Sequence, residues 1–228
     1  MRIDPRPSSA QACPAWPYMA CVAAFAATTQ FGTYSSALNR LGLPVWAATL
    51  LLTATVTLRS ANVRMFVLRN GRQRLRQFSP TLQRMVLRWR DPFAEQTTIL
   101  INIGSVLLPL GYSVYALMRG AVGPMQLWIA SMLVAGVVQF FRLPFSIGPM
   151  VRPFVVIAPL VASVLGWALG ANDQAPLAYV SGFVGILVGS DLLHVNDLNH
   201  IGKAQVVISG DASFDAVFLN ELFSMVLS

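Results

Sequence analysis

The chain alternates between long apolar stretches and short polar connections. A helix that crosses a bilayer needs about 20 mostly apolar residues. Seven segments approach or reach that length: Pro17–Leu38, Pro44–Leu58, Thr97–Met118, Met125–Phe141, Phe154–Leu169, Leu177–Leu193 and Phe214–Leu227. The last is short and crosses only with local bilayer thinning or help from its neighbours, so whether 214–227 crosses stays open. The pattern predicts an all-α fold, a polytopic transmembrane bundle of about seven spans.

A basic segment at 59–96 interrupts this pattern. Nine arginines lie between Arg59 and Arg90, and no acidic residue occurs there before Asp91. Apolar residues recur at the spacing of one helical face at Leu82, Met85, Val86 and Trp89. Two interpretations stay open. The segment is either a basic amphipathic helix on the cytoplasmic membrane surface, against anionic lipid headgroups, or a solvated loop that sets topology.

Composition supports a membrane protein. Hydrophobic residues make up 55% of the 228 residues and charged residues only 11%, whereas soluble domains carry about 25% charged residues. Residues 1–228 therefore form a single integral membrane domain. The net charge of +7 is concentrated in one inter-span segment, so we expect no nucleic-acid partner. Cys13 and Cys21 have no metal-type spacing.

Charge asymmetry predicts the orientation of the chain. With a cytoplasmic N-terminus and seven crossings, only Arg40 and Arg119 of the 16 Lys and Arg residues lie outside. This strong positive-inside bias supports seven crossings with a cytoplasmic N-terminus. We expect the chain in the cytoplasmic (inner) membrane of a prokaryote. The first apolar segment has no clear cleavage site and is expected to remain as an uncleaved helix.

Four polar residues are then expected at the cytoplasmic ends of the third, fourth, sixth and seventh spans: Asn102, Arg142, Asp191 and Asp215. Charged groups in a span are costly, so these residues are candidates for a functional pocket. Two adjacent aspartates could share a proton and activate water, as in aspartyl proteases. However, Gly189-Ser190-Asp191 lacks the first glycine of the Gly-x-Gly-Asp element of intramembrane aspartyl enzymes. In the simpler interpretation, Asp191 pairs with Arg142 or caps a helix, and the helix dipole favours Asp215.

Other polar residues suggest no metal or cofactor. Asp191, His194, Asp197 and His200 recur every third residue, a step that rotates steadily off one helical face, so we expect no metal site. The sequence has no phosphate-binding loop, Gly-x-Ser-x-Gly elbow or His-Glu-x-x-His motif, and we expect no cofactor.

Two features of the last spans concern packing. Glu221 is the deepest acidic residue if the seventh segment crosses; it then faces the bundle, protonated or paired, and otherwise the segment is interfacial. Gly182, Gly185 and Gly189 recur at intervals of three and four, which predicts a close helix-packing face.

Three ordered stretches resemble the membrane family known as domain of unknown function 1614. They are Ile101–Ser105 with Leu108–Leu110, Ala175–Gly182 running on into Gly189–Leu193, and Ile208–Leu219. The resemblance extends over most of the chain from about Leu41. The family typically shows Gly-Gly-Ala-Gly before a Phe-Asp-Gly, where this chain has Asp211, Ser213 and Ala216. The family has no established activity, so the resemblance implies only a membrane protein with polar motifs at one end.

Three functions remain open from the sequence. The first is transport or ion coupling through a polar cytoplasmic-side pocket with Asp191 and Asp215 as protonatable sites. The second is an intramembrane aspartyl hydrolase that uses the same two residues. The third is a non-catalytic accessory subunit that docks on another membrane protein. The sequence favours a protein that is not an enzyme.

Overall fold

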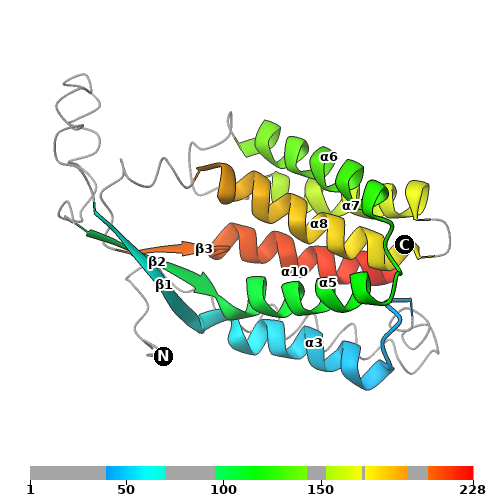
Figure 1. Cartoon of the computed structure of the whole chain (residues 1–228), viewed down its shortest axis with the longest axis horizontal. Coiled ribbons are helices and arrows are strands. Elements are labelled where there is room, and N and C mark those ends of the chain that lie inside the picture. The colour runs from blue at the N-terminus through cyan, green and yellow to red at the C-terminus, as the bar shows by residue number, and fades with distance from the viewer. Residues whose placement is uncertain (1–39, 70–95, 143–152, 171–172, 195–204, 228) are drawn as a thin grey trace.

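The computed structural model describes residues 40–69, 96–142, 153–170, 173–194 and 205–227. Over these residues the chain is mostly helical, with a small sheet at one end (Figure 1). The α-helices are α3 (Val45–Thr57), α5 (Leu108–Met118), α6 (Pro124–Arg142), α7 (Phe154–Leu169), α8 (Gln174–Ser190) and α10 (Asp211–Val226). The short helices are η2 (Leu58–Ser60), the π-helix η4 (Ile103–Leu107) and η5 (Leu192–His194). The strands are β1 (Asn62–Arg69), β2 (Gln96–Asn102) and β3 (Gln205–Ile208).

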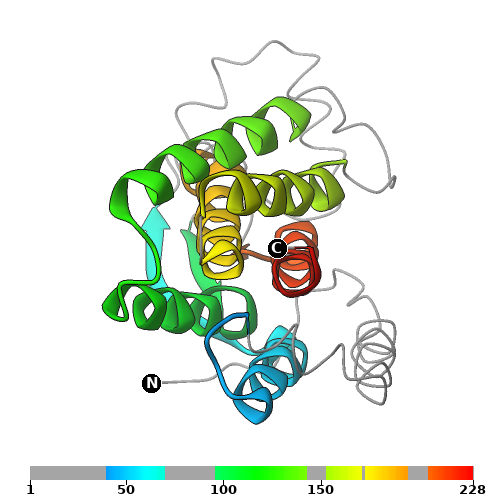
Figure 2. The same cartoon turned by 90° about the vertical axis from the view of Figure 1, so that its right-hand side faces the viewer.

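The six α-helices alternate in direction, so the bundle has a sheet end and an opposite end (Figure 1). Helices α3, α6 and α8 run toward the sheet, and α5, α7 and α10 run away from it. Helix α8 lies in the middle and packs against α5, α6, α7 and α10 (Figure 2). The core follows α8 on both sides, one cluster toward α3 and α5 and the other toward α6 and α7.

Small residues allow α8 to occupy this central position. Thirteen of its 17 residues are buried. A Cβ atom added to Gly185 would lie 2.6 Å from the Cβ atom of Val134, and one on Gly189 would lie 2.7 Å from the carbonyl oxygen of Ala135. Two of the three glycines of the predicted packing face therefore pack closely against α6, whereas the third, Gly182, packs against Asn220 of α10.

The sheet corrects the all-α prediction. Strand β1 pairs antiparallel with β2, with a bulge between Arg64 and Phe66, and β2 pairs parallel with β3. Part of the expected basic loop is therefore strand β1. The expected third span, Thr97–Met118, begins as a strand and becomes an α-helix only at Leu108. Its first residues are largely β-branched or apolar, which suits a strand whose neighbours bury it.

Within the described residues, one helix is long and apolar enough to cross a membrane. It is α6, over Pro124–Phe141, and only 28% of that window is buried in the structure. Three shorter helical segments are also apolar: Ile103–Met118, Phe154–Leu169 and Gln174–Ser190. The seven-span arrangement therefore stays a prediction. The first expected span and the helical stripe at 82–89 lie outside the described residues.

Candidate polar site at the sheet end

Two parallel strands end side by side, and each leads into a helix. The last pair in their register is Ile101 with Ile208, so Asn102 and Ser209 follow at the same edge. Strand β2 continues into η4 and α5, and β3 continues into α10. Because the carboxyl ends of parallel strands meet at one edge of a sheet, polar groups from separate parts of the chain gather there.

Asn102 connects β2 to the turn that follows α3. Its Oδ1 atom accepts a hydrogen bond from the backbone N–H of Ser105 at 3.0 Å, which caps η4. Its Nδ2 atom donates to the carbonyl oxygen of Arg59 and, at 3.1 Å, to Oδ1 of Asn62. Asn102 is buried, and both ends of its amide have partners, so it fixes the position of the surrounding backbone.

Ser209 occupies the corresponding position after β3. Its φ is 56°, in the left-handed region that non-glycine residues rarely adopt. Its N–H donates to Oδ2 of Asp191 at 3.0 Å, and its carbonyl oxygen accepts from the hydroxyl of Ser105 at 2.7 Å. Its own Oγ atom is buried and has no hydrogen-bond partner among the described residues.

Asp191 joins the end of α8 to the start of α10. It is the C-cap residue of α8 and holds the backbone of Ser209. The hydroxyl of Ser213 in α10 lies 3.4 Å from Oδ1 of Asp191 and 3.1 Å from the hydroxyl of Ser190. The interpretation of Asp191 as a residue at a helix end thus has a structural counterpart. Of Arg142, its proposed partner, the structure describes only the backbone, as the last residue of α6.

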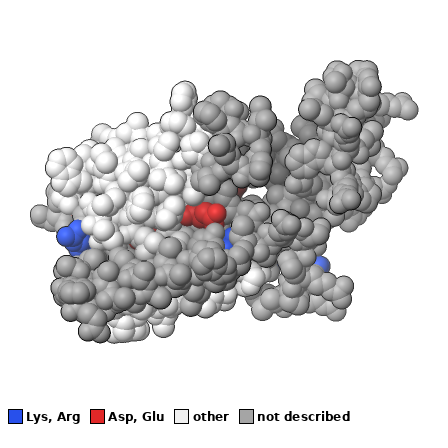
Figure 3. Space-filling view, turned by 180° about the vertical axis from the view of Figure 1, so that it is seen from behind, with Lys and Arg blue, Asp and Glu red and all other residues white. Residues whose placement is uncertain are grey.

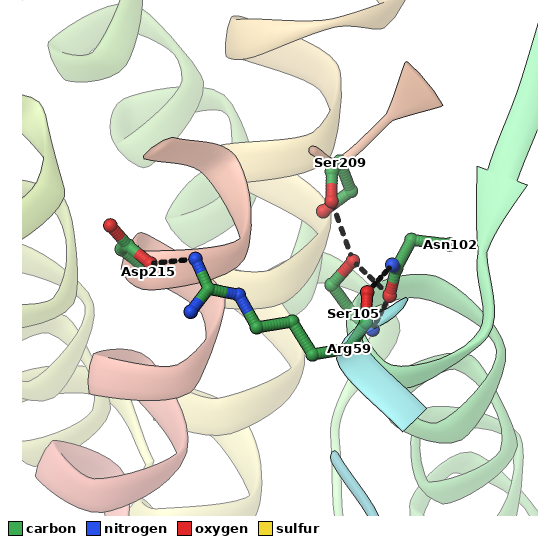
Figure 4. Close-up of polar contacts among 5 residues, drawn as sticks. All are labelled: Arg59, Asn102, Ser105, Ser209 and Asp215. Carbon is green, nitrogen blue, oxygen red and sulfur yellow. Dashed lines mark hydrogen bonds and ion pairs between the residues drawn. The ribbon is translucent and has the colours of Figure 1, made fainter. Parts of the chain in front are cut away.

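Asp215 pairs with Arg59, which sequence reasoning had assigned only to the basic loop. Their Oδ1 and Nη2 atoms lie 3.8 Å apart, and the side chains are 33% and 14% exposed. The guanidinium also lies over the ring of Phe214, 4.9 Å from its centroid. Arg59 thus reaches from the end of α3 to α10, while its carbonyl oxygen accepts from Asn102 (Figure 4).

We call the connected groups of Arg59, Asn102, Ser105, Asp191, Ser209, Ser213 and Asp215 the sheet-end network. Three of the four residues that the sequence nominated belong to it: Asn102, Asp191 and Asp215. Sequence reasoning missed Arg59 and Ser209. The Ser-Gly pair directly after an apolar strand was the available signal for Ser209.

The network contains two carboxylates, three serine hydroxyls and one guanidinium. Asp191 contacts a backbone N–H and a hydroxyl, whereas Asp215 faces Arg59. Such groups can exchange protons or contact a small polar ion. No group of three or more His, Cys, Asp and Glu side chains suited to a metal is found within the described ranges, which do not include Asp197 and His200.

A second polar cluster lies within the bundle core. Oε1 of Glu221 accepts hydrogen bonds from the hydroxyls of Tyr179, at 2.8 Å, and Thr55, at 3.2 Å. The neighbouring Asn220 donates to the carbonyl oxygen of Tyr179 at 3.0 Å and packs over Gly182. We call these groups the core cluster. Glu221 therefore faces the bundle, the first of the two placements that the sequence left open.

Comparison with known proteins gives the family of the chain. A model of the family described as "Protein of unknown function (DUF1614)" matches residues 57–227, so the chain belongs to that family. The match includes all three of the stretches that carried the resemblance. Neither the curated proteins nor the solved structures contain a match to the chain.

Proposed function

We propose that this DUF1614 family member is an integral protein of the prokaryotic cytoplasmic membrane that works in transport or ion coupling, with the sheet-end network as its polar site. The observation that carries the proposal is a connected set of charged and hydroxyl groups at one end of a bundle whose exposed helix faces are largely apolar. Asp191 and Asp215 are its protonatable members, and Arg59 supplies the positive charge.

The outward surface of the helices supports a membrane location. Large apolar side chains are exposed along α5, α6 and α7, among them Met118, Met125, Trp128, Phe140, Val164 and Trp167. These three helices contain no Asp, Glu or Lys, and their one arginine is Arg142 at the end of α6. The white surface over the bundle is bordered by charged atoms rather than interrupted by them (Figure 3). Soluble monomers rarely expose apolar surface this extensive.

The distribution of arginines supports an orientation with the sheet end in the cytoplasm. Arg59, Arg64 and Arg69 belong to η2 and β1, and Arg142 ends α6 at the same end of the bundle. Arg40 and Arg119 belong to the opposite end. The positive-inside rule then assigns the sheet end to the cytoplasm, where the basic segment 59–96 meets anionic lipid headgroups.

The placement of the two aspartates favours ion coupling over the hydrolase alternative. An aspartyl hydrolase needs two carboxyl groups that share one proton. Here Asp215 faces a guanidinium, and Asp191 binds the backbone of Ser209. An accessory subunit that docks on another membrane protein is the other alternative, and the exposed apolar face of α6 is what would support it.

A pH jump applied to proteoliposomes on a solid-supported membrane tests the proposal, with the proton as the probe. An ion-coupling protein gives a transient charge displacement that Asp191→Asn or Asp215→Asn reduces at least severalfold. The matched control is Asp173→Asn, which removes one exposed charge at the opposite end of the bundle and leaves the signal unchanged. Equal signals from wild-type protein and both variants would contradict the proposal.

The same variants separate the alternatives. A hydrolase loses all turnover of a membrane peptide with either asparagine. An accessory subunit tolerates both and fails only when Gly182, Gly185 or Gly189 is enlarged. A proton-coupled carrier keeps ligand binding and loses its pH dependence.

A further inference from the structure

Glu221 is an acidic side chain in the interior of the bundle. Its exposed fraction is 0%, and it projects from the second half of α10 between α3 and α8. Both of its hydrogen bonds reach Oε1, from Tyr179 and Thr55. Its other oxygen, Oε2, is buried without a hydrogen-bond partner among the described residues.

Among the residues that the structure describes, the helices around Glu221 offer no balancing positive charge. Helices α3 and α7 contain no titratable residue, and α8 contains only Tyr179. Helix α5 contributes Tyr112, whose ring packs edge-on against the ring of Tyr179, with 4.5 Å between the ring centroids. On α10 itself the nearest described acid is Asp215, six residues away, and it faces Arg59. An ionised carboxylate buried without a cation is far more costly than a neutral carboxylic acid.

We infer that Glu221 is a proton-binding site inside the bundle: its carboxyl group carries a proton on Oε2 in this conformation and releases it at alkaline pH. On release, the O–H bond at Oε2 breaks, a water molecule accepts the proton, and a carboxylate remains. This inference names the proton as the coupled ion. A role of the Glu221 proton in transport rests on the proposed function.

Contacts along one side of α10 join Glu221 to the sheet-end network. Thr55 and Arg59 are four residues apart and reach the same helix, where Thr55 meets Glu221 in the core and Arg59 meets Asp215 at the sheet end. The six residues from Asp215 to Glu221 span about 9 Å along α10. The stacked, buried rings of Phe214 and Phe218 project from α10 along this stretch.

Infrared spectroscopy of the full-length protein in lipid tests the proton site directly. Wild-type protein should show the C=O band of a protonated carboxylic acid, which shifts in heavy water and disappears at alkaline pH. Glu221→Gln keeps the shape of the side chain and should abolish the band. The control Asp215→Asn, at the sheet end, should retain it. A wild-type spectrum without the band, or a band that persists in Glu221→Gln, overturns the inference.

A second variant keeps the test decisive if Glu221→Gln fails to fold. Tyr179→Phe removes the hydrogen bond to Oε1 and should shift the same band to higher frequency, because the C=O bond loses a donor. An unshifted band in Tyr179→Phe overturns the assignment to Glu221. Wild-type protein that shows the Glu221 band but gives no charge displacement in the pH jump refutes the proposed transport and leaves the proton site intact.

Discussion

Ser209 combines two features that folding disfavours: a left-handed backbone, and a buried hydroxyl that has no hydrogen-bond partner in the part of the chain that the structure describes. Such residues persist where the surroundings determine their conformation, and they cluster at functional sites. Here Asp191 and Ser105 hold the N–H and the carbonyl group of Ser209 from opposite sides. The strain therefore lies at the point where β3 turns into α10, within the sheet-end network.

Substitutions at Ser209 should separate backbone strain from the role of the hydroxyl. Ser209→Gly relieves the φ of 56° at an entropic cost of about 0.5–1 kcal/mol, so the melting temperature should stay close to wild type. Ser209→Val places a β-branched residue in the same conformation and should lower it clearly. Thermal unfolding in detergent measures both, and equal melting temperatures for the two variants would disprove the role of the backbone.

Asn102 should contribute more to stability than any neighbouring amide. Asn102→Ala removes the cap of η4 and leaves the carbonyl oxygen of Arg59 without this donor, so we expect a loss of about 2–4 kcal/mol. The control is Asn62→Ala, at a half-buried residue that shares one hydrogen bond with Asn102. This variant should lose about 1 kcal/mol of stability or less. Chemical denaturation followed by tryptophan fluorescence gives the comparison, and similar losses would refute it.

The sequence could nominate Asn102, Asp191 and Asp215 because polar residues in apolar segments stand out. It could not nominate Arg59, since this residue is one of nine arginines in a basic stretch and only the fold brings it to Asp215. The bond from Asn102 to Asn62 depends on the pairing of β1 with β2. The bond from Ser105 to Ser209 depends on the pairing of β2 with β3, which joins residues more than 100 positions apart. Side-chain patterns within one segment carry no information about such pairing.

At the scale of elements, helices were predictable and strands were not. The expected segment Phe154–Leu169 coincides with α7, and Met125–Phe141 differs from α6 by one residue at each end. Residues 97–102 were assigned to a helix because a short apolar run does not distinguish a buried strand from a helical turn. Strand β3 escaped notice because it has only four residues, within a polar connector.

The packing of α8 predicts that glycine-to-alanine substitutions at two positions change the stability of the bundle in opposite directions. Gly185→Ala places a methyl group 2.6 Å from the Cβ atom of Val134 and should destabilise the bundle by about 1–3 kcal/mol. The matched control is Gly136→Ala on the exposed side of α6, where an added Cβ meets nothing within 4 Å. That variant should be more stable than wild type by about 0.5–1 kcal/mol, because alanine is more favourable than glycine within a helix. Thermal unfolding in lipid nanodiscs measures both variants. Equal shifts of the two melting temperatures would refute the close packing of Gly185 against α6.

At the scale of the whole molecule, polar groups occupy two depths along the α3–α10 interface. The sheet-end network lies where the bundle meets the sheet, and the core cluster lies farther along α10, with Phe214 and Phe218 on the same helix. The outer helices α6 and α7 carry apolar side chains on their exposed faces. The polar groups of each cluster therefore contact one another, away from the exposed apolar faces of α6 and α7.

The orientation of the bundle can be tested by labelling its two ends. In a background with Cys13 and Cys21 replaced by serine, Met118→Cys marks the end opposite the sheet, where Met118 is 84% exposed, and Ser60→Cys marks the sheet end. A membrane-impermeant maleimide added to intact spheroplasts should label Met118→Cys at once and Ser60→Cys only after permeabilisation, because the positive-inside rule assigns the arginine-rich end to the cytoplasm. The reverse order of labelling would invert the orientation and turn the sheet-end network away from the cytoplasm. Labelling of both cysteines in intact spheroplasts would contradict a bundle that spans the membrane between these two ends.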